Sequence, residues 1–427
     1  MQNVDEIFEK ISKVGDGIAE KRKELIEADI TAGFTYTTSA GIIDVHVKNM
    51  RNFRTALKYI GNRKGICGKD EWTALVFPFN VTLGACGPIA CQMLVGNNLM
   101  VKPSPISIKT YQILESIWTR YFPDNVRFDY GDAQQFMTSA IKDPKVKVIG
   151  AYGTDAVAMK YKDLVKQYGK TYFFEGPGKN PAIVLNDANP DDAAKQLVGL
   201  RFLMNAGQVC LSPGRFYIHE DVFERFSKNM IELLKGAVVV GDPNDSKTNI
   251  GFMGSERAVA AITEQLKDAV SKGAKIICGG KIEGKMVPPT VITNVNHQMI
   301  GMREESFGPV AWLMSFKTTD EAIKLAKDNK YGLGATIFGV KDAQKVKSAL
   351  KGEDYLHYVD DFVFGKFGIV ETDVARLFGD PDFAERMEYG PMGGYGYSGW
   401  VWKTVDGKFR MMQGPKSFAI ETSVKLE

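Results

Sequence analysis

The fold class follows from a segment that begins with Leu99-Met100-Val101-Lys102 and ends with Val126-Arg127-Phe128-Asp129-Tyr130. Both runs have the apolar texture of strands, and residues 106–121 between them have the pattern of a helix. A strand, a helix and a second strand in this order predict a βαβ unit, whose two strands lie parallel in one sheet.

The same alternation continues on both sides of this unit. Further strands are predicted at 145–150, 171–174, 215–218 and 275–278, and further helices at 156–168, 221–234 and 256–272. The turn Asp187-Ala188-Asn189-Pro190 begins a second alternating block. The sequence therefore predicts an α/β protein with mainly parallel sheets and a domain boundary near residue 185.

The two ends of the chain have patterns of their own. In residues 1–30, apolar side chains recur at helical spacing among charges, which predicts one amphipathic helix. Residues 416–424 alternate like a strand and are predicted to form an arm. Such an arm favours strand exchange between subunits, and hence a homodimer or a homotetramer.

Composition narrows the possible classes of function. The 427 residues carry 54 basic and 51 acidic side chains, a net charge of +3, without a basic block or a basic stripe interleaved with aromatics. Nucleic-acid binding is therefore not expected. A hydrophobic content of 44% suffices for two or three domains with large cores.

Targeting signals and cysteine usage favour a cytoplasmic protein. Residues 1–6 are polar and lack the apolar core of a signal peptide, and no run of about eighteen uncharged apolar residues predicts a membrane span. Five cysteines, an odd number without a CxxC pair, suit free thiols in a reducing compartment. The four histidines lack ligand spacing, so no metal site is expected.

Cys210 and Glu175 are the two residues that point most directly to chemistry. Cys210 follows a loop of small and amide residues, 205–209, and Glu175 precedes the turn Gly176-Pro177-Gly178. A thiolate can attack a carbonyl carbon, and a carboxylate can activate the water that releases the acyl group. A single cysteine is more often a buried core residue, so the neighbouring motifs have to decide between the two interpretations.

Six segments now occur in a fixed order along the chain. They are Phe77-Pro78-Phe79-Asn80, residues 96–104, Gly153-Thr154, residues 174–181 with Glu175, residues 205–210 with Cys210, and residues 303–310. Together with Tyr331-Gly332-Leu333 and Pro391-Met392-Gly393-Gly394, this order resembles the aldehyde dehydrogenase superfamily over about residues 75–427. The N-terminal portion before Asn80 is short compared with typical members.

The resemblance implies the architecture of that family. It would consist of two doubly wound parallel-sheet domains and an oligomerisation arm. The implied dinucleotide-binding domain covers 1–185, the catalytic domain with the nucleophilic cysteine covers 186–390, and a C-terminal segment with the oligomerisation strand covers 391–427.

The resemblance also implies catalytic roles for three residues. Cys210 would be the nucleophile and would form a thiohemiacetal and then a thioester. The Asn80 side-chain amide and the Cys210 backbone N–H would form the oxyanion hole. Glu175 would activate the hydrolytic water. These roles predict oxidation of an aldehyde to a carboxylic acid with NAD or NADP.

The implied cofactor site draws on four further positions. The residues around Gly153 and Thr154 would present the first amides of a helix, and the Thr154 hydroxyl, to the pyrophosphate. Glu305 would accept hydrogen bonds from the nicotinamide ribose, and Phe307 would pack nearby. The local sequence is not a GxGxxG fingerprint, so this assignment depends on the resemblance.

One departure from the family concerns the choice of dinucleotide. Lys102 would contact the adenosine ribose, and most relatives carry a Glu three residues later, where this chain has Pro105. That Glu would bind the 2′-hydroxyl of NAD and repel the 2′-phosphate of NADP. With Lys102 and Ser104 beside Pro105, we predict that NADP is used at least as well as NAD.

Other departures keep alternative functions open. No Lys occurs between Asn80 and Lys102, so a proton relay from Glu175 has to use other groups. The turn 176–178 is similar to that of the CoA-acylating branch. The first alternative is therefore a CoA-acylating aldehyde dehydrogenase, or an acyl-CoA or acyl-phosphate reductase that uses Cys210. A catalytically silent dinucleotide-binding or structural protein is the second. The small and apolar neighbours of Cys210 favour a neutral aldehyde as substrate.

Overall fold

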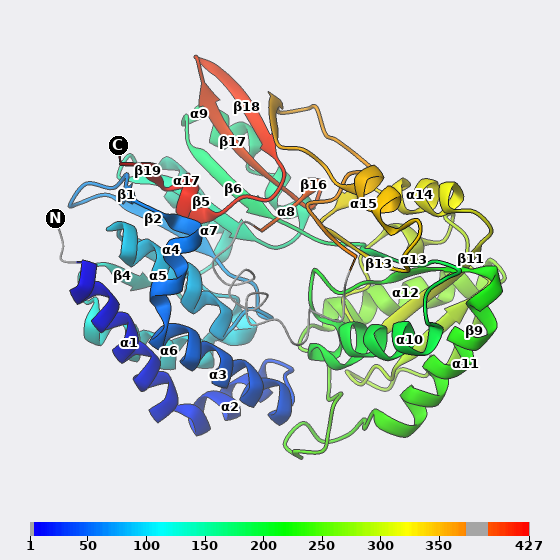
Figure 1. Cartoon of the computed structure of the whole chain (residues 1–427). Helices are drawn as coiled ribbons and strands as arrows, with labels where there is room; N and C mark the ends of the chain where they lie inside the picture. The colour runs from blue at the N-terminus through cyan, green and yellow to red at the C-terminus, as the bar shows by residue number, and fades with distance from the viewer. Residues whose placement is uncertain (1–3, 373–391, 427) are drawn as a thin grey trace.

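A computed structural model describes residues 4–372 and 392–426, and the structural statements below concern these residues. Two large sheets form the frame, and Figure 1 shows them in separate lobes. The first sheet has eight strands in the order β14-β18-β17-β6-β5-β2-β3-β4, and the second has seven in the order β15-β13-β7-β8-β11-β10-β9. The predicted α/β class with two sheets is confirmed.

The first sheet joins a parallel half to an antiparallel half. The parallel strands are β2 (Trp72–Val76), β3 (Leu99–Lys102), β4 (Val126–Phe128), β5 (Val146–Tyr152) and β6 (Thr171–Glu175). The antiparallel strands are β14 (Tyr355–Tyr358), β17 (Gly399–Val405) and β18 (Lys408–Gln413), and β17 pairs with β6. The chain thus returns to the first sheet with β14, adds one more strand to the second sheet, and then completes the first sheet with β17 and β18.

The second sheet is parallel except at one edge. Its strands are β7 (Pro181–Val184), β8 (Arg215–His219), β9 (Lys275–Cys278), β10 (Thr290–Thr293), β11 (Val310–Phe316), β13 (Gly334–Phe338) and β15 (Ile369–Glu371). Only β9 pairs antiparallel, with β10, among the pairings of this sheet that the structure describes. Its central strands are buried on both faces, because helices cover the two sides.

Helices cover both faces of each sheet. On the first sheet α5 (Cys86–Val95) and α6 (Ile108–Tyr121) lie on one face, and α7 (Ala133–Lys142), α8 (Asp155–Met159) and α9 (Lys162–Gln167) on the other. On the second sheet α10 (Pro190–Val198) and α11 (Glu220–Ala237) lie opposite α12 (Glu256–Ser271), α14 (Thr319–Lys327) and α15 (Ala343–Leu350). The unit β3–α6–β4 is the predicted βαβ element, with parallel pairing of Leu99 and Val126.

Short elements complete the chain. They are α4 (Leu57–Ile60), β1 (Arg63–Gly65), α13 (Ile300–Arg303), β12 (Tyr331–Gly332), β16 (Tyr395–Gly396), α17 (Phe418–Glu421) and β19 (Ser423–Lys425). No helix among the described residues has both the length and the apolar character needed to cross a bilayer.

Three N-terminal helices lie at one end of the first sheet (Figure 1), where the first two pack on α6 and the third packs on those two and on α5. They are α1 (Val4–Glu20), α2 (Arg22–Thr31) and α3 (Tyr36–Arg51). The predicted single helix over 1–30 is therefore wrong, because the chain turns at Lys21 so that α1 and α2 both reach α3 and α6. The predicted helix over 156–168 is likewise divided, into α8 and α9.

The predicted strand at 416–424 is also wrong. The segment contains the short helix α17, and only Ser423–Lys425 form a strand, which pairs with β1 of the same chain. Phe418 and Ala419 are adjacent and both buried, and the Phe418 ring packs edge-on against Phe173. Two consecutive buried residues suit a helix that packs on the sheet and not an alternating arm.

The sheets divide the chain at residues 176–180, between β6 and β7. The proposed boundary at 185 lies just beyond β7, and β14 belongs to the first sheet although it precedes residue 390. The division into 1–185, 186–390 and 391–427 stays a prediction. Pro391, the first residue of the quoted Pro-Met-Gly-Gly motif, lies outside the described residues.

Candidate active site

A cavity of about 1320 Å³ opens between the two sheets and is lined by side chains from both lobes. Eight of the nine predicted site residues line it: Asn80, Ser104, Gly153, Thr154, Glu175, Cys210, Glu305 and Phe307. The ninth, Lys102, is buried beside the cavity, and its Nζ donates to the Pro103 carbonyl at 3.3 Å. The structure thus brings the separate sequence motifs together at one place.

The Cys210 loop is built on an unusual backbone. Asn205, Ala206 and Gly207 all have positive φ angles, of 47°, 51° and 71°. A Cβ atom at Gly207 would come within 2.5 Å of the Gly308 carbonyl oxygen, so this residue has to be glycine. The left-handed turn presses the loop against the 303–310 segment and leaves Cys210 half-buried at the cavity wall.

Asn180 fixes the other side of the Cys210 loop. Its Nδ2 donates to the Cys210 carbonyl at 2.7 Å, and its Oδ1 accepts from the Gly334 N–H at 3.0 Å. The side chain therefore ties the Cys210 loop to β13 of the second sheet. Sequence reasoning gave Asn180 no role, although the residue lies five positions after Glu175 in the quoted motif.

Glu175 is the last residue of β6 and points into a dry environment. Its side chain is buried, and Oε2 has no hydrogen-bond partner. Burial raises the pKa of Glu175 to about 8, because the ionised carboxylate has lost its water. A carboxyl group with such a pKa can exchange a proton near neutral pH.

The thiol of Cys210 is equally affected by its surroundings. Burial raises the pKa of Cys210 well above its usual value, and the nearby carboxylates of Glu175 and Glu305 raise it further. The backbone N–H groups of Leu211 and Cys210 act in the opposite direction. Without an added positive charge, the thiol form therefore dominates at neutral pH.

Asn80 follows β2 in the loop that begins with Phe77. It is half-buried and lines the same cavity as Cys210. Phe79, beside it, meets the Phe307 ring edge-on at 5.9 Å between centroids. The aromatic contact joins the loop of the first sheet to the segment that carries Glu305, so the two lobes meet directly over the cavity.

Glu305 is held by a backbone donor from the Glu175 turn. The Gly178 N–H donates to Oε1 of Glu305 at 2.9 Å. Burial raises the pKa of Glu305 to about 7, although this bond and the cations of Arg201 and Lys179 act in the opposite direction. A ribose hydroxyl pair could donate to such a carboxylate.

Two buried cations support the Glu305 segment from behind. Arg201 donates to the carbonyl oxygens of Ser306 and Val310, and to the Ser212 hydroxyl. Lys179 Nζ donates to the Ser306 hydroxyl at 2.9 Å. Burial lowers the pKa of Lys179 well below its usual value, and the neighbouring arginines lower it further. These contacts fix the Glu305 segment relative to the Cys210 loop.

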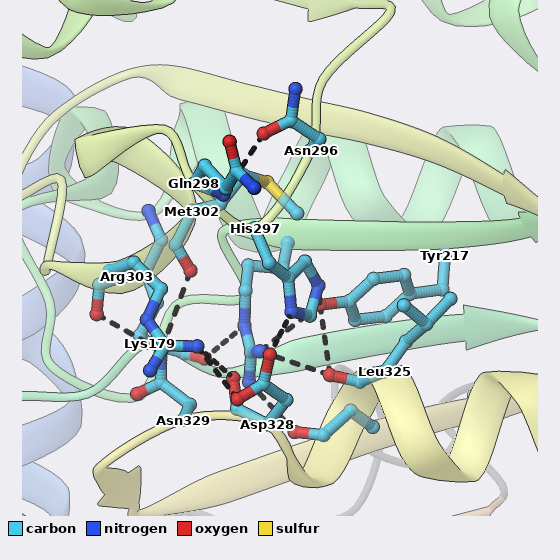
Figure 2. A network of polar contacts seen from close by, with 12 residues as sticks. Lys179, Tyr217, Asn296, His297, Gln298, Met302, Arg303, Leu325, Asp328 and Asn329 are labelled. Carbon is cyan, nitrogen blue, oxygen red and sulfur yellow. Dashed lines mark hydrogen bonds and ion pairs between the residues drawn. The ribbon is translucent and has the colours of Figure 1, made fainter.

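A second polar network holds the same segment from the side, as Figure 2 shows. His297 Nδ1 is 2.7 Å from Oδ2 of Asp328, and His297 Nε2 is 2.8 Å from the Tyr217 hydroxyl. Arg303 donates to Oδ1 of Asp328 at 2.7 Å. Asn329 donates to the Arg303 carbonyl at 3.0 Å. Arg303 is thus held through both its side chain and its backbone, two residues before Glu305.

The far end of the cavity has the features of an anion site. The Thr154 hydroxyl is buried without a hydrogen-bond partner, and the residue lines the cavity just before α8. A Cβ atom at Gly153 would meet no atom within 4 Å, so there is open space in front of the backbone. An unpartnered hydroxyl beside open space at the start of a helix fits the pyrophosphate of a dinucleotide.

Lys330 is a cavity-lining cation that the sequence motifs did not single out. Its Nζ lies 3.0 Å from Oε1 of Glu304 and 3.8 Å from Oδ2 of Asp155. Asp155 belongs to the first lobe, so the ion pairs bridge the two sides of the cavity. Its place directly before Tyr331-Gly332-Leu333, a motif of the resemblance, was the available signal.

Comparisons with known proteins agree with this arrangement. A model described as the aldehyde dehydrogenase family matches residues 8–353. A lactaldehyde dehydrogenase of Methanococcus maripaludis is 30% identical over 292 residues, 67% of this chain and 60% of that protein. A succinate-semialdehyde dehydrogenase [NADP(+)] of Mycobacterium ulcerans is 31% identical over 63% of this chain and 60% of its own length. The chain thus matches only about 60% of the length of these curated relatives.

The solved structures extend the likeness in fold over the whole chain. A crystal structure of an aldehyde dehydrogenase from Brucella melitensis biovar abortus superposes with a TM-score of 0.81. It covers 99% of this chain and 84% of that one, at 22% sequence identity. At this identity the likeness shows a shared fold.

Proposed function

The chain belongs to the aldehyde dehydrogenase family, and we propose that it oxidises an aldehyde to a carboxylic acid with NADP or NAD. The observation that carries the proposal is the single cavity lined by Cys210, Glu175 and Asn80. A nucleophile, a base and an amide donor around one space are the groups that acyl transfer to water needs.

The residues at the far end of the cavity would hold the dinucleotide. Gly153 and the free Thr154 hydroxyl would bind its pyrophosphate, and Glu305 with Phe307 would contact the nicotinamide ribose. The bound dinucleotide supplies the acceptor for the hydride that leaves the substrate carbon. Its positive charge would also favour the thiolate of Cys210, against the two carboxylates that raise the thiol pKa.

Cys210 would attack the aldehyde carbon and form a thiohemiacetal. The Asn80 amide and the Cys210 backbone N–H would stabilise the negative charge on the former carbonyl oxygen. Loss of hydride from this carbon converts the thiohemiacetal to a thioester. The left-handed loop before Cys210 supports this role, because it fixes the backbone N–H next to the sulfur.

Glu175 would then activate a water molecule that attacks the thioester. The water oxygen bonds to the acyl carbon, its proton passes to the Glu175 carboxylate, and the Cys210 sulfur leaves as the thiolate. Burial raises the pKa of Glu175 to about 8, which makes the ionised form a stronger base than an ordinary carboxylate. The unpartnered Oε2 leaves an acceptor free for that water.

We further propose that NADP is slightly preferred. Ser104 and Pro105 line the cavity where the adenosine ribose would lie, and no carboxylate at 105 would repel a 2′-phosphate. Lys102 is buried close by, and burial lowers its pKa, although Asp129 and Asp132 act in the opposite direction. The Mycobacterium ulcerans relative, whose name includes NADP(+), is consistent with this preference.

A neutral aldehyde suits the substrate end of the cavity. Apolar side chains make up much of its lining, namely Ile42, Val45, Val81, Met204, Val209 and Leu211. These side chains carry no charge to bind a carboxylate or phosphate on the substrate, and two of the cations in the lining, Lys330 and Lys416, are already paired with carboxylates. The relatives' names include both a lactaldehyde and a succinate-semialdehyde enzyme, so the exact aldehyde has to come from experiment.

The same proposal covers the setting of the enzyme. None of the five cysteines, all of which lie in the described part of the chain, forms a disulfide, which suits the reducing cytoplasm. The predicted homodimer or homotetramer stays a prediction, and it loses the support of a strand over 416–424, because that segment contains the helix α17 and its strand residues pair with β1 of the same chain.

An aldehyde panel with NAD and with NADP, each with and without CoA, tests the proposal. Formation of reduced nicotinamide without CoA, lost in a Cys210→Ala variant, is the expected result. A rate that requires CoA would favour the CoA-acylating alternative, which the turn 176–178 resembles. No turnover in either direction would leave the catalytically silent binding protein.

A further inference from the structure

Asp29 is a fully buried carboxyl group that no step of the proposed reaction uses. It lies on α2 with 0% of its side chain exposed. Three hydroxyl groups donate to it: Ser39 on α3 at 2.8 Å, Thr110 on α6 at 2.8 Å and Thr82 at 3.4 Å. Three separate segments therefore converge on one carboxylate.

One of these segments is the loop that carries Asn80. Thr82 is two residues after Asn80, and the residue between them, Val81, is also held from the interior. The Tyr111 hydroxyl donates to the Val81 carbonyl at 2.7 Å. Tyr111 is fully buried and follows Thr110, a donor to Asp29, on α6. The loop is thus held at Thr82 by Asp29 and at Val81 by Tyr111. We call Asp29, Ser39, Thr82, Thr110 and Tyr111 the Asp29 cluster.

The Asp29 cluster is costly to bury, which indicates that it has a purpose beyond packing. Burial raises the pKa of Asp29 to about 6, and the three hydroxyl donors offset this only in part. An apolar side chain would avoid the cost of desolvation but could not accept hydrogen bonds from three elements at once. The carboxylate gives the loop a fixed distance and direction from α2, α3 and α6.

We propose that Asp29 is a positioning residue which, through Thr82 and together with Tyr111, fixes the loop that presents the Asn80 amide to the cavity. The inference rests on the proposed function, because the oxyanion role of Asn80 belongs to it. Oxyanion donors act only when they lie at hydrogen-bond distance from the developing charge. A small displacement of the loop would therefore lower the rate of the chemical step more than substrate binding.

Three variants of the full chain test the positioning role. Thr82→Val and Tyr111→Phe each remove one hydroxyl next to the loop, and Asp29→Asn removes the charge and keeps one acceptor oxygen. Each is expected to lower kcat about 5-fold or more, with the KM for the aldehyde within about 2-fold. Thr119→Val is the matched control, because this hydroxyl also lies on α6 but bonds only to the Glu115 carbonyl. It should keep the activity of the unmodified chain.

Hydrogen exchange of residues 78–85 separates this inference from the proposed function. Faster exchange in this loop in the three variants, with the midpoint of thermal unfolding close to that of Thr119→Val, supports positioning. Unchanged kcat and unchanged exchange overturn it, as does a loss of kcat that only follows a loss of thermal stability. If the unmodified chain turns over no aldehyde, the proposed function fails, and the exchange result alone then decides the role of Asp29.

Discussion

The backbone N–H of Gly178 donates a 2.9 Å hydrogen bond to Oε1 of Glu305, which lies 127 residues further along the chain. On its other side, a Cβ atom at position 178 would come within 2.2 Å of the Cys210 carbonyl oxygen. Gly178 therefore lies between the Cys210 loop and the Glu305 carboxylate, which we propose contacts the cofactor ribose. The close approach of three segments explains why the smallest residue is needed there.

Gly178→Ala is expected to damage the site and the fold together. The new methyl group has to displace backbone, which typically costs about 1–3 kcal/mol of stability. We expect kcat/KM to fall about 100-fold, because the Cys210 loop moves relative to the other groups. Gly236→Ala in α11 is the control, since its added Cβ would meet no atom within 4 Å. Equal activity of the two variants would contradict the packing argument.

Glu175→Gln is expected to separate the two halves of the reaction. The amide cannot take a proton from water, so hydrolysis should slow by about 100-fold or more. Formation of the thioester should continue, which predicts one burst of reduced nicotinamide per active site followed by a slow steady rate. Rapid mixing with aldehyde and dinucleotide measures the burst, and mass spectrometry of the quenched protein detects the acyl group on Cys210. Full steady turnover without CoA would exclude Glu175 as the base.

The pH dependence of hydrolysis follows from the same carboxyl group. Burial raises the pKa of Glu175 to about 8, and a base works only in its ionised form. Hydrolysis of the thioester should therefore speed up as the pH rises through about 8 and level off above it. Single-turnover rates across about pH 6 to 10 measure this. A rate that is flat through this range would show that another group activates the water.

The stability of the folded state should decrease as Glu175 ionises, whereas the rate of hydrolysis increases. The folded-state pKa of Glu175 lies above the ordinary value of 4.5, so the buried neutral form favours the folded state. This contribution is complete below about pH 4.5 and is lost as the pH rises through about 8. The thermal midpoint of the unmodified chain should fall over that window more than that of Glu175→Gln. A parallel course of the two curves would contradict the assigned pKa.

The catalytic candidates that line the cavity could be named from the sequence because each belongs to a short local pattern. Cys210, Glu175 and Asn80 each have characteristic neighbours within a few residues, and their order along the chain is itself informative. Runs such as Leu99–Lys102 became strands because apolar residues of this length are buried between helices. Local sequence therefore predicts both the elements and the catalytic candidates.

The supporting groups were not predictable because their meaning depends on residues far away in the sequence. Asn180 and Asp29 are ordinary polar residues until the fold places the Cys210 carbonyl and the Thr82 hydroxyl beside them. The strand predicted near Phe418 was wrong for a related reason. Alternation over a few residues fits a short helix as well as a strand, and the outcome depends on packing such as the contact of Phe418 with Phe173.

Dinucleotide choice can be shifted at Pro105. This residue lines the cavity at the start of a short 3-10 helix, a position that tolerates Glu. In a Pro105→Glu variant the carboxylate should repel a 2′-phosphate and accept from a 2′-hydroxyl, which raises the ratio of kcat/KM for NAD over NADP by about 10-fold or more. Pro105→Gln is the uncharged control. If both variants change the ratio equally, charge at this position does not set the preference.

Asp328→Ala tests whether the network of Figure 2 holds the Glu305 segment. Asp328 accepts from Arg303 and from His297 at 2.7 Å each, and Arg303 lies two residues before Glu305. Without this carboxylate the segment should lose its lateral support, and the KM for the dinucleotide should rise about 10-fold. The KM for the aldehyde should stay within about 2-fold, because the Cys210 loop keeps its own bonds to Asn180.

Asp320→Ala, which breaks an exposed ion pair with Lys345, controls for the loss of a surface charge. A similar rise in both variants, or an equal rise for both substrates, would mean that Asp328 acts through general stability and not through the cofactor site.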